Sequence, residues 1–151
     1  MQTIAQALKK LQRSTFRSRF RLSAKDKAYI AEKGMDVIAR HAADFVRTRL
    51  APAVIPNDGK QTPMRGHPVF VAQHACACCC RGCLQKWYRV PVGRELTEDQ
   101  QARLVRLLLA WIQAQLDADP QFVREYLQRS DDSPPSDASD SPSNVQPPTR
   151  A

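Results

Sequence analysis

The sequence lacks the long apolar run that a membrane-spanning helix requires. No stretch approaches the ~20 consecutive apolar residues needed to cross a bilayer. The first ten residues also lack the basic region followed by an apolar run that is typical of a secretory signal peptide. Both absences predict a cytoplasmic protein without a membrane span.

Several motifs that would name a reaction are also missing. The chain has no metalloprotease H-E-x-x-H, no serine-hydrolase elbow, and no phosphate-binding loop that ends in Gly-Lys-Ser/Thr. It also lacks internal repeats and the alternation of strands and helices expected of a thioredoxin-like oxidoreductase. The sequence therefore indicates where a functional site lies but not which reaction it performs.

Cysteine is absent from most of the chain, because all five cysteines lie between Cys76 and Cys83. Neighbouring cysteines rarely meet disulfide geometry and would close only very short loops, so a disulfide framework is not expected. We expect thiols that are reduced or metal-bound, as in a cytoplasmic protein. Because His67 and His74 lie just upstream, residues 67–83 form the candidate site.

Basic residues predominate, with a formal net charge of +8 that is concentrated near the N-terminus. Residues 1–50 contain twelve Lys and Arg against four Asp and Glu, whereas residues 101–151 contain five against seven. A basic surface of this kind favours an anionic partner, nucleic acid first and anionic lipid second. The alternative is a solvated basic helical surface that only keeps the protein soluble.

Apolar periodicity and capping residues predict a mainly α-helical fold, a single small domain of five or six short helices over residues 1–129. Ser23 and Asp26 form a weak capping box, Gly34 ends that helix, and Thr97 and Gln100 form a clear capping box before the most regular apolar stripe. The expected helices cover 2–12, 24–33, 35–50, a Cys/His-rich helix or knuckle within 68–88, the stretch after Thr97, and 119–127. Residues 130–151 are rich in Ser, Pro and Asp without periodicity, so we expect a disordered tail.

The cysteine-rich stretch has three interpretations. In the first, the cysteines have the spacing of an apolar helix stripe, and free cysteine often packs as a small buried hydrophobe.

A metal site is the second interpretation: zinc is the expected metal and an iron–sulfur cluster is less favoured, with ligands drawn from His67, His74, Cys79, Cys80 and Cys83. Such a site requires a turn, which we expect near Gly82, or a remote ligand such as His41, although a histidine on the apolar side of its helix is more often a core residue. The third interpretation is thiol chemistry, in which a helix N-terminus near Cys79 and the neighbouring Arg81 lower a cysteine pKa.

Two further segments contain candidate binding residues. In residues 16–22, Phe16, Phe20 and Leu22 alternate with arginines. If this segment is extended, one side presents Arg17, Arg19 and Arg21 to phosphates. The loop 57–66 precedes the cysteine-rich stretch and offers the hydrogen-bonding side chains of Asp58, Lys60, Gln61, Thr62 and Arg65.

Three groups of residues resemble a known family of short bacterial proteins, the domain of unknown function 4186. They are Asn57-Asp-Gly-Lys-Gln-Thr-Pro-Met-Arg-Gly-His-Pro-Val-Phe, Gln73-His-Ala, and Cys79-Cys-Arg-Gly-Cys-Leu followed by Lys86-Trp. The resemblance covers about residues 16–112 and implies no activity. The family pattern has threonine where this chain has Cys76 and Cys78, and histidine at Tyr88. The resemblance therefore favours Cys79, Cys80 and Cys83 as ligands, while Tyr88 removes one potential ligand.

Two functions from different classes follow from these observations. The first is a small nucleic-acid-associated binding protein in which the arginines of residues 13–21 meet phosphates, with or without a Cys/His metal site. The second is an enzyme of unknown reaction, with a thiol or metal centre beside loop 57–66, where Lys60 and Arg65 would hold an anionic substrate. The sequence favours the binding protein.

Overall fold

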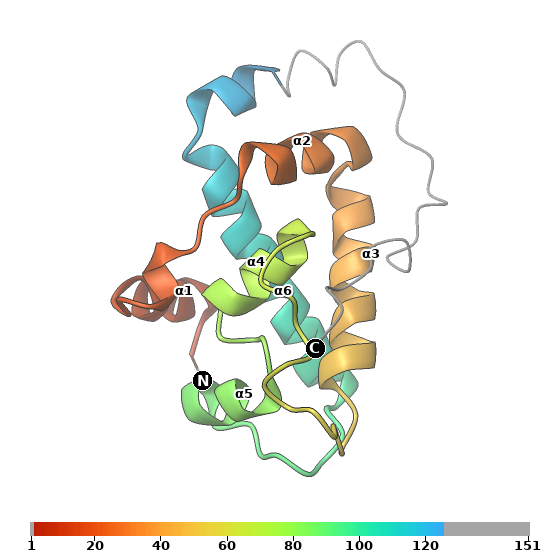
Figure 1. Cartoon of the computed structure of the whole chain (residues 1–151). Helices are drawn as coiled ribbons and strands as arrows, with labels where there is room; N and C mark the ends of the chain where they lie inside the picture. The colour runs from red at the N-terminus through yellow and green to blue at the C-terminus, as the bar shows by residue number, and fades with distance from the viewer. Residues whose placement is uncertain (1, 126–151) are drawn as a thin grey trace.

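The computed structural model describes residues 2–125, which form helices joined by loops (Figure 1). In chain order the elements are α1 (Ile4–Gln12), the 3-10 helix η1 (Arg17–Arg19), α2 (Ala24–Lys33), α3 (Met35–Phe45), the π-helical turn η2 (Val46–Leu50), α4 (Pro68–Ala75), α5 (Arg81–Tyr88) and α6 (Glu98–Asp117). A further helical segment covers 120–125, and no strand occurs between residues 2 and 125. The predicted mainly α-helical fold is confirmed; the end of the predicted helix 119–127 and the tail lie outside the described residues.

Side-chain caps define the starts of α2 and α6, as the sequence predicts. The Ser23 hydroxyl accepts the backbone N–H of Asp26 at 3.0 Å, and the Asp26 carboxylate accepts the N–H of Ser23 at 3.1 Å. Thr97 and Gln100 form the same reciprocal pair before α6. Gly34, with a φ of 88°, ends α2 in a conformation that suits glycine, and α3 starts at the next residue.

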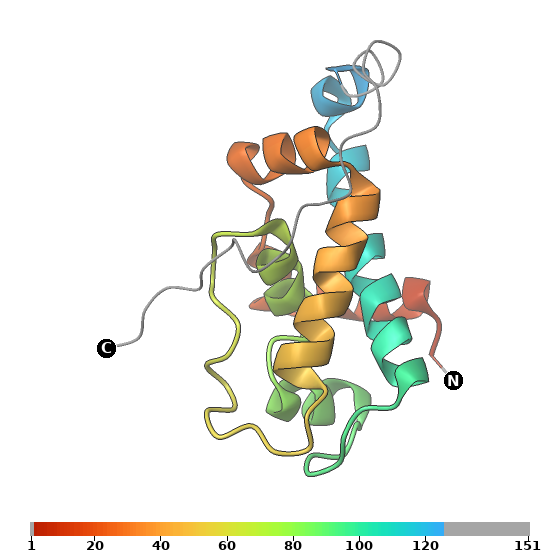
Figure 2. The same ribbon diagram turned by 90° about the vertical axis from the view of Figure 1, so that its right-hand side faces the viewer.

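The core lies between α6 and the helices that cover it. Figures 1 and 2 show α6 passing through the middle of the domain, with α3 and α4 packed against it and α1 along another side. The buried residues of α6 follow the predicted stripe: Leu104, Leu107, Leu108, Ile112 and Leu116. No helix in the described range is long and apolar enough to cross a membrane.

Candidate functional site

A bend between α4 and α5 determines where the cysteines lie. Ala77 adopts a left-handed backbone conformation with a φ of 58°, and α5 begins at Arg81. The Cys78 backbone N–H donates to the Gln73 carbonyl at 2.7 Å, and the Gln73 side chain donates to the Cys78 carbonyl at 3.1 Å. The expected turn near Gly82 is wrong in position, because Gly82 lies in the first turn of α5 and the chain bends before that helix.

Three cysteine sulfurs meet at the start of α5. The Sγ atoms of Cys79, Cys80 and Cys83 all lie within 4.8 Å of one another, and those of Cys79 and Cys83 are 3.5 Å apart. Cys80 is the N-cap residue of α5, and its sulfur accepts the backbone N–H of Cys83 at 3.3 Å. Ligand distances of about 2.3 Å in a tetrahedral zinc–thiolate site place two sulfurs about 3.8 Å apart, so this spacing fits one ion. The cluster could hold a metal ion, and it is the one such group of His, Cys, Asp or Glu side chains found between residues 2 and 125.

The other two cysteines belong to the core. Cys76 and Cys78 have no exposed surface, and burial raises the pKa of both thiols well above its usual value. The Cys78 thiol donates to the Cys76 carbonyl, within the bend. For these two side chains the packing interpretation holds.

Arg17 points into the domain and contacts the sulfur cluster. One of its terminal nitrogens, Nη1, donates to the His74 carbonyl at 2.7 Å and lies 3.7 Å from the Cys79 sulfur, while Nη2 lies 3.2 Å from the Cys83 sulfur. Residues 17–19 form the 3-10 helix η1 instead of the extended segment considered from the sequence. In a helical turn, alternate side chains do not point to opposite sides, so the period-two arrangement is lost. The arginines therefore do not form one row: Arg17 is buried, whereas Arg19 and Arg21 are exposed.

The positive charge of Arg17 favours a negative charge on the sulfur cluster. No carboxylate in the described range pairs with this buried guanidinium, and an unpaired buried charge is costly. A hydrogen bond between the Cys79 and Cys83 sulfurs lowers the pKa of Cys79, against the effect of burial, and Arg17 lowers it further. A negative charge on the cluster would therefore neutralise Arg17.

His74 lies beside the cluster but uses its ring elsewhere. Its Nε2 is 3.0 Å from the Thr62 carbonyl oxygen and 3.2 Å from that of Pro63, so this nitrogen carries a proton and donates. Its ring stacks on Phe20, with centroids 5.7 Å apart. His74 thereby attaches loop 57–66 to α4, and its backbone carbonyl orients Arg17.

His67 lies apart from the cluster, in a buried pair with His41. Its Nδ1 accepts the backbone N–H of Val69 at 3.0 Å as the N-cap of α4, and its Nε2 lies 2.8 Å from Nδ1 of His41. Because Nδ1 of His67 accepts, its proton is on Nε2 and is donated to His41. Burial lowers the pKa of His67 to about 3, and His41 and Arg49 lower it in the same direction. His67 is therefore neutral at ordinary pH, and His41 is buried in the core.

Loop 57–66 lies beside the start of α5 (Figure 2) and is hydrogen-bonded to the turn that carries the cysteines. The Asp58 carboxylate accepts the backbone N–H groups of Arg81 at 2.8 Å and Gly82 at 3.0 Å. The Gln61 side chain donates to the same carboxylate at 2.9 Å, and the Thr62 hydroxyl donates to the Cys79 carbonyl at 2.7 Å. Asp58, Gln61 and Thr62 thus hold the cysteine-bearing turn, whereas the side chains of Lys60 and Arg65 are exposed.

The sequence did not reveal the role of Arg81. Its buried guanidinium donates to four backbone carbonyls, at distances between 2.7 and 3.1 Å: those of Leu50, Pro52, Pro91 and Arg94. These bonds join the end of η2 and the segment before α6 to the first residue of α5. A charged residue next to two cysteines was the only available signal, and it pointed to thiol activation.

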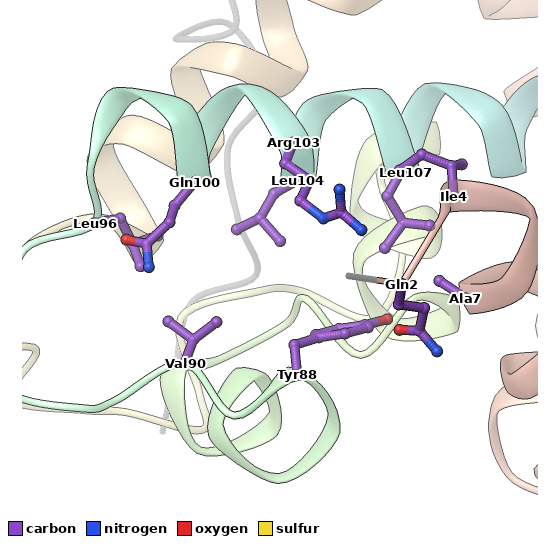
Figure 3. A pocket seen from close by; sticks show the side chains of 10 residues that line it. All are labelled: Gln2, Ile4, Ala7, Tyr88, Val90, Leu96, Gln100, Arg103, Leu104 and Leu107. Carbon is purple, nitrogen blue, oxygen red and sulfur yellow. The ribbon is translucent and has the colours of Figure 1, made fainter.

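A cavity of about 390 Å³ lies on the other side of this region, between α1, α6 and the end of α5 (Figure 3). Leu104, Leu107 and Arg103 of α6 face the ring of Tyr88 across it. The Tyr88 hydroxyl donates to the Cys76 carbonyl, so one wall of the cavity is attached to the bend that carries the cysteines.

A family model, described as "Domain of unknown function (DUF4186)", matches residues 5–113. The chain belongs to the DUF4186 family. The match confirms the resemblance seen in the sequence and includes every residue of the sulfur cluster. No solved structure matches this DUF4186 chain.

Proposed function

We propose that this DUF4186 protein is a zinc-binding protein whose ligands are the thiolates of Cys79, Cys80 and Cys83. The contact between the buried Arg17 and these sulfurs is the observation that carries the proposal. One Zn²⁺ with three thiolates has a net charge of −1, which the +1 charge of the guanidinium neutralises. The same charge balance supplies the anion that a buried arginine requires.

The ligand set favours zinc over an iron–sulfur cluster. Soft thiolate ligands select zinc, copper(I) or iron–sulfur centres, and iron–sulfur clusters are held by four cysteines in most proteins. Only three sulfurs of the chain meet here, because Cys76 and Cys78 are fully buried in the core. A three-sulfur zinc site leaves the fourth tetrahedral position for water or an exchangeable ligand.

Hydrogen bonds around the sulfurs support the same conclusion. The Cys83 backbone N–H reaches the Cys80 sulfur, and Thr62 holds the Cys79 carbonyl. Bonds of this kind orient metal ligands and tune their basicity. The site is thus arranged before an ion enters.

A metal-free thiol centre is the second candidate, and it corresponds to the enzyme alternative. The Cys79 sulfur lies between the Cys83 thiol and the Arg17 guanidinium, an arrangement that stabilises a thiolate. In this case Cys79 is the nucleophile, and it reacts with alkylating reagents near neutral pH faster than the other cysteines.

Nucleic-acid binding, which the sequence favoured, has weaker support. The net charge of +8 and the exposed side chains of Arg19 and Arg21 support it, but Arg17 contacts thiols rather than solvent. Binding to nucleic acid stays a prediction, and its test is given in the Discussion.

The deciding experiment is elemental analysis of protein purified without oxygen or chelator. We expect about one zinc per chain in the unaltered protein and a marked loss of zinc in Cys79→Ser, Cys80→Ser and Cys83→Ser. Arg19→Gln is a matched surface control and should retain the zinc. No zinc in the unaltered protein, together with one fast-reacting thiol, would favour the thiol centre instead.

A further inference from the structure

The sulfurs of the cluster are not equivalent partners for one another. The spacing Cys80-Arg-Gly-Cys83 suggests that these two cysteines would pair if oxidised. In the structure the Cys80 sulfur accepts the Cys83 backbone N–H as the cap of α5, whereas the Cys83 sulfur lies 3.5 Å from that of Cys79. This geometry favours a pair four positions apart, Cys79 and Cys83, over the pair three positions apart.

Exposure also separates the cluster from the other thiols. Cys83 is partly exposed, and Cys79 and Cys80 each retain 8% of their surface, while Cys76 and Cys78 retain none. The Arg17 guanidinium contacts both sulfurs of the pair, so it can meet a negative charge on either. Exposure therefore admits a small oxidant to the cluster but not to the two core thiols, and within the cluster the 3.5 Å separation and the shared contact with Arg17 single out Cys79 and Cys83.

We propose that Cys79 and Cys83 form a site of reversible oxidation by hydroperoxides, hydrogen peroxide being the simplest, and that their disulfide and a bound metal ion exclude each other. The disulfide rests on the cluster geometry alone, whereas the exclusion of metal rests on the zinc site proposed above.

The chemistry balances with one peroxide per disulfide. The Cys79 thiolate attacks one peroxide oxygen, the O–O bond breaks, and hydroxide leaves, which makes a sulfenic acid. The Cys83 sulfur then attacks the Cys79 sulfur, the S–OH bond breaks, and the hydroxyl leaves as water with the Cys83 proton. Two electrons pass from the sulfurs to the peroxide. The reverse step needs a dithiol reductant.

Oxidation removes two of the three proposed ligands at once. Cys80 alone cannot retain a zinc ion, so disulfide formation releases the metal. Because Asp58 and Arg81 hold the start of α5 through bonds that involve no sulfur, the helix remains in place in both states. The cluster therefore exchanges a metal for a disulfide within an unchanged fold.

Peptide mapping of the full chain tests the pairing. Trypsin cleaves after Arg81, so a disulfide that includes Cys83 joins two tryptic peptides, but Cys79 and Cys80 remain together on one of them. Matched variants therefore decide the partner: with stoichiometric hydrogen peroxide we expect joined peptides in the unaltered protein and in Cys80→Ser, and none in Cys79→Ser. Alkylation after denaturation should label three of the five cysteines of the oxidised protein.

Joined peptides in Cys79→Ser but not in Cys80→Ser would assign the pair to Cys80 and overturn the proposal, as would the absence of joined peptides in every sample. A zinc-sensitive dye, read on the same samples, separates the two proposals. A disulfide in protein that never held zinc contradicts the zinc site alone. Zinc that stays bound in fully oxidised protein contradicts the mutual exclusion.

Discussion

The Asp58 carboxylate accepts the backbone N–H of Arg81 at 2.8 Å, across 23 positions of sequence. It therefore acts as a distant cap at the start of α5, where a negative charge also interacts favourably with the helix dipole. Although partial burial alone would raise the pKa of Asp58, hydrogen bonds from Gln61, Arg81 and Gly82 lower it. The cap that holds the cysteine-bearing turn thus comes from the loop before α4.

Removal of this cap should destabilise the domain. We expect Asp58→Ala to lower the free energy of unfolding by about 1–2 kcal/mol, the usual value of a helix cap. The unfolding free energy of Asp58→Asn, which keeps one acceptor but no charge, should lie between that of Asp58→Ala and that of the unaltered protein. Denaturant unfolding at neutral pH measures the differences. Because the folded pKa is depressed, the advantage of Asp58 over Asn should fade as the pH falls through that pKa; a difference that does not change in acid would contradict the charged cap.

The buried His67, which lies against His41, should make stability depend on pH. The folded pKa of His67, about 3, lies below its ordinary value of 6.5, so the unfolded chain binds the proton more tightly. Stability from this group is complete above about pH 6.5 and falls towards pH 3, by up to about 1.4 kcal/mol per pH unit. Denaturant unfolding between these pH values tests it.

His67→Asn is the appropriate control for this titration. Asparagine can accept the N–H of Val69 and preserve the start of α4, but it does not titrate. We expect a shallower dependence of the unfolding free energy on pH in this variant. An equal slope in the variant and the unaltered protein would show that other groups dominate.

Arg17 should tune the affinity of the cluster for metal. Loss of a residue that contacts metal ligands without binding the metal typically weakens affinity about 10- to 100-fold. We expect an effect of this size for Arg17→Met, which leaves the proposed net charge of −1 without a partner, and a smaller one for Arg17→Lys. Competition with a zinc chelator measures both, with Arg19→Met as the matched control. Equal zinc affinities for the Arg17 and Arg19 variants would show that Arg17 does not affect metal binding.

The same arginines give a direct test of nucleic-acid binding. Any affinity for a labelled oligonucleotide should come from exposed charges and fall steeply as salt rises. Arg19→Gln and Arg21→Gln should then weaken binding at low salt, while Arg17→Gln should not, because Arg17 is buried. Absence of binding by the unaltered protein at low salt would remove this function.

The helices were predictable because their signals are local. Ser23, Gly34 and Thr97 act within one turn of their own position, and the predicted helix boundaries at these residues are confirmed. Pro68 likewise occupies the first turn of α4. The choice of Cys79, Cys80 and Cys83 over Cys76 and Cys78 came from the family resemblance, and the structure brings those three sulfurs together.

The bend and the contacts of the cluster were not predictable in the same way. Alanine rarely adopts a left-handed conformation, so Ala77 gives no turn signal, while Gly82 gives one that the structure does not use. Arg17 lies 62 positions before Cys79 and 66 before Cys83. The alternation of Arg17 with aromatic residues fits an exposed segment as well as a buried one. Only packing between distant elements distinguishes an exposed, phosphate-binding arginine from one that contacts buried sulfurs.

Arg81 gives the sulfur cluster a frame that does not depend on an ion. Its guanidinium, a cation of the protein's own side chain, donates to four backbone carbonyls and so holds the surrounding segments together. In small zinc domains, by contrast, loss of the metal unfolds the chain. Here we expect occupancy of the site to follow the free metal concentration around the protein while the domain stays folded, so that chelation empties the site without removing the protein.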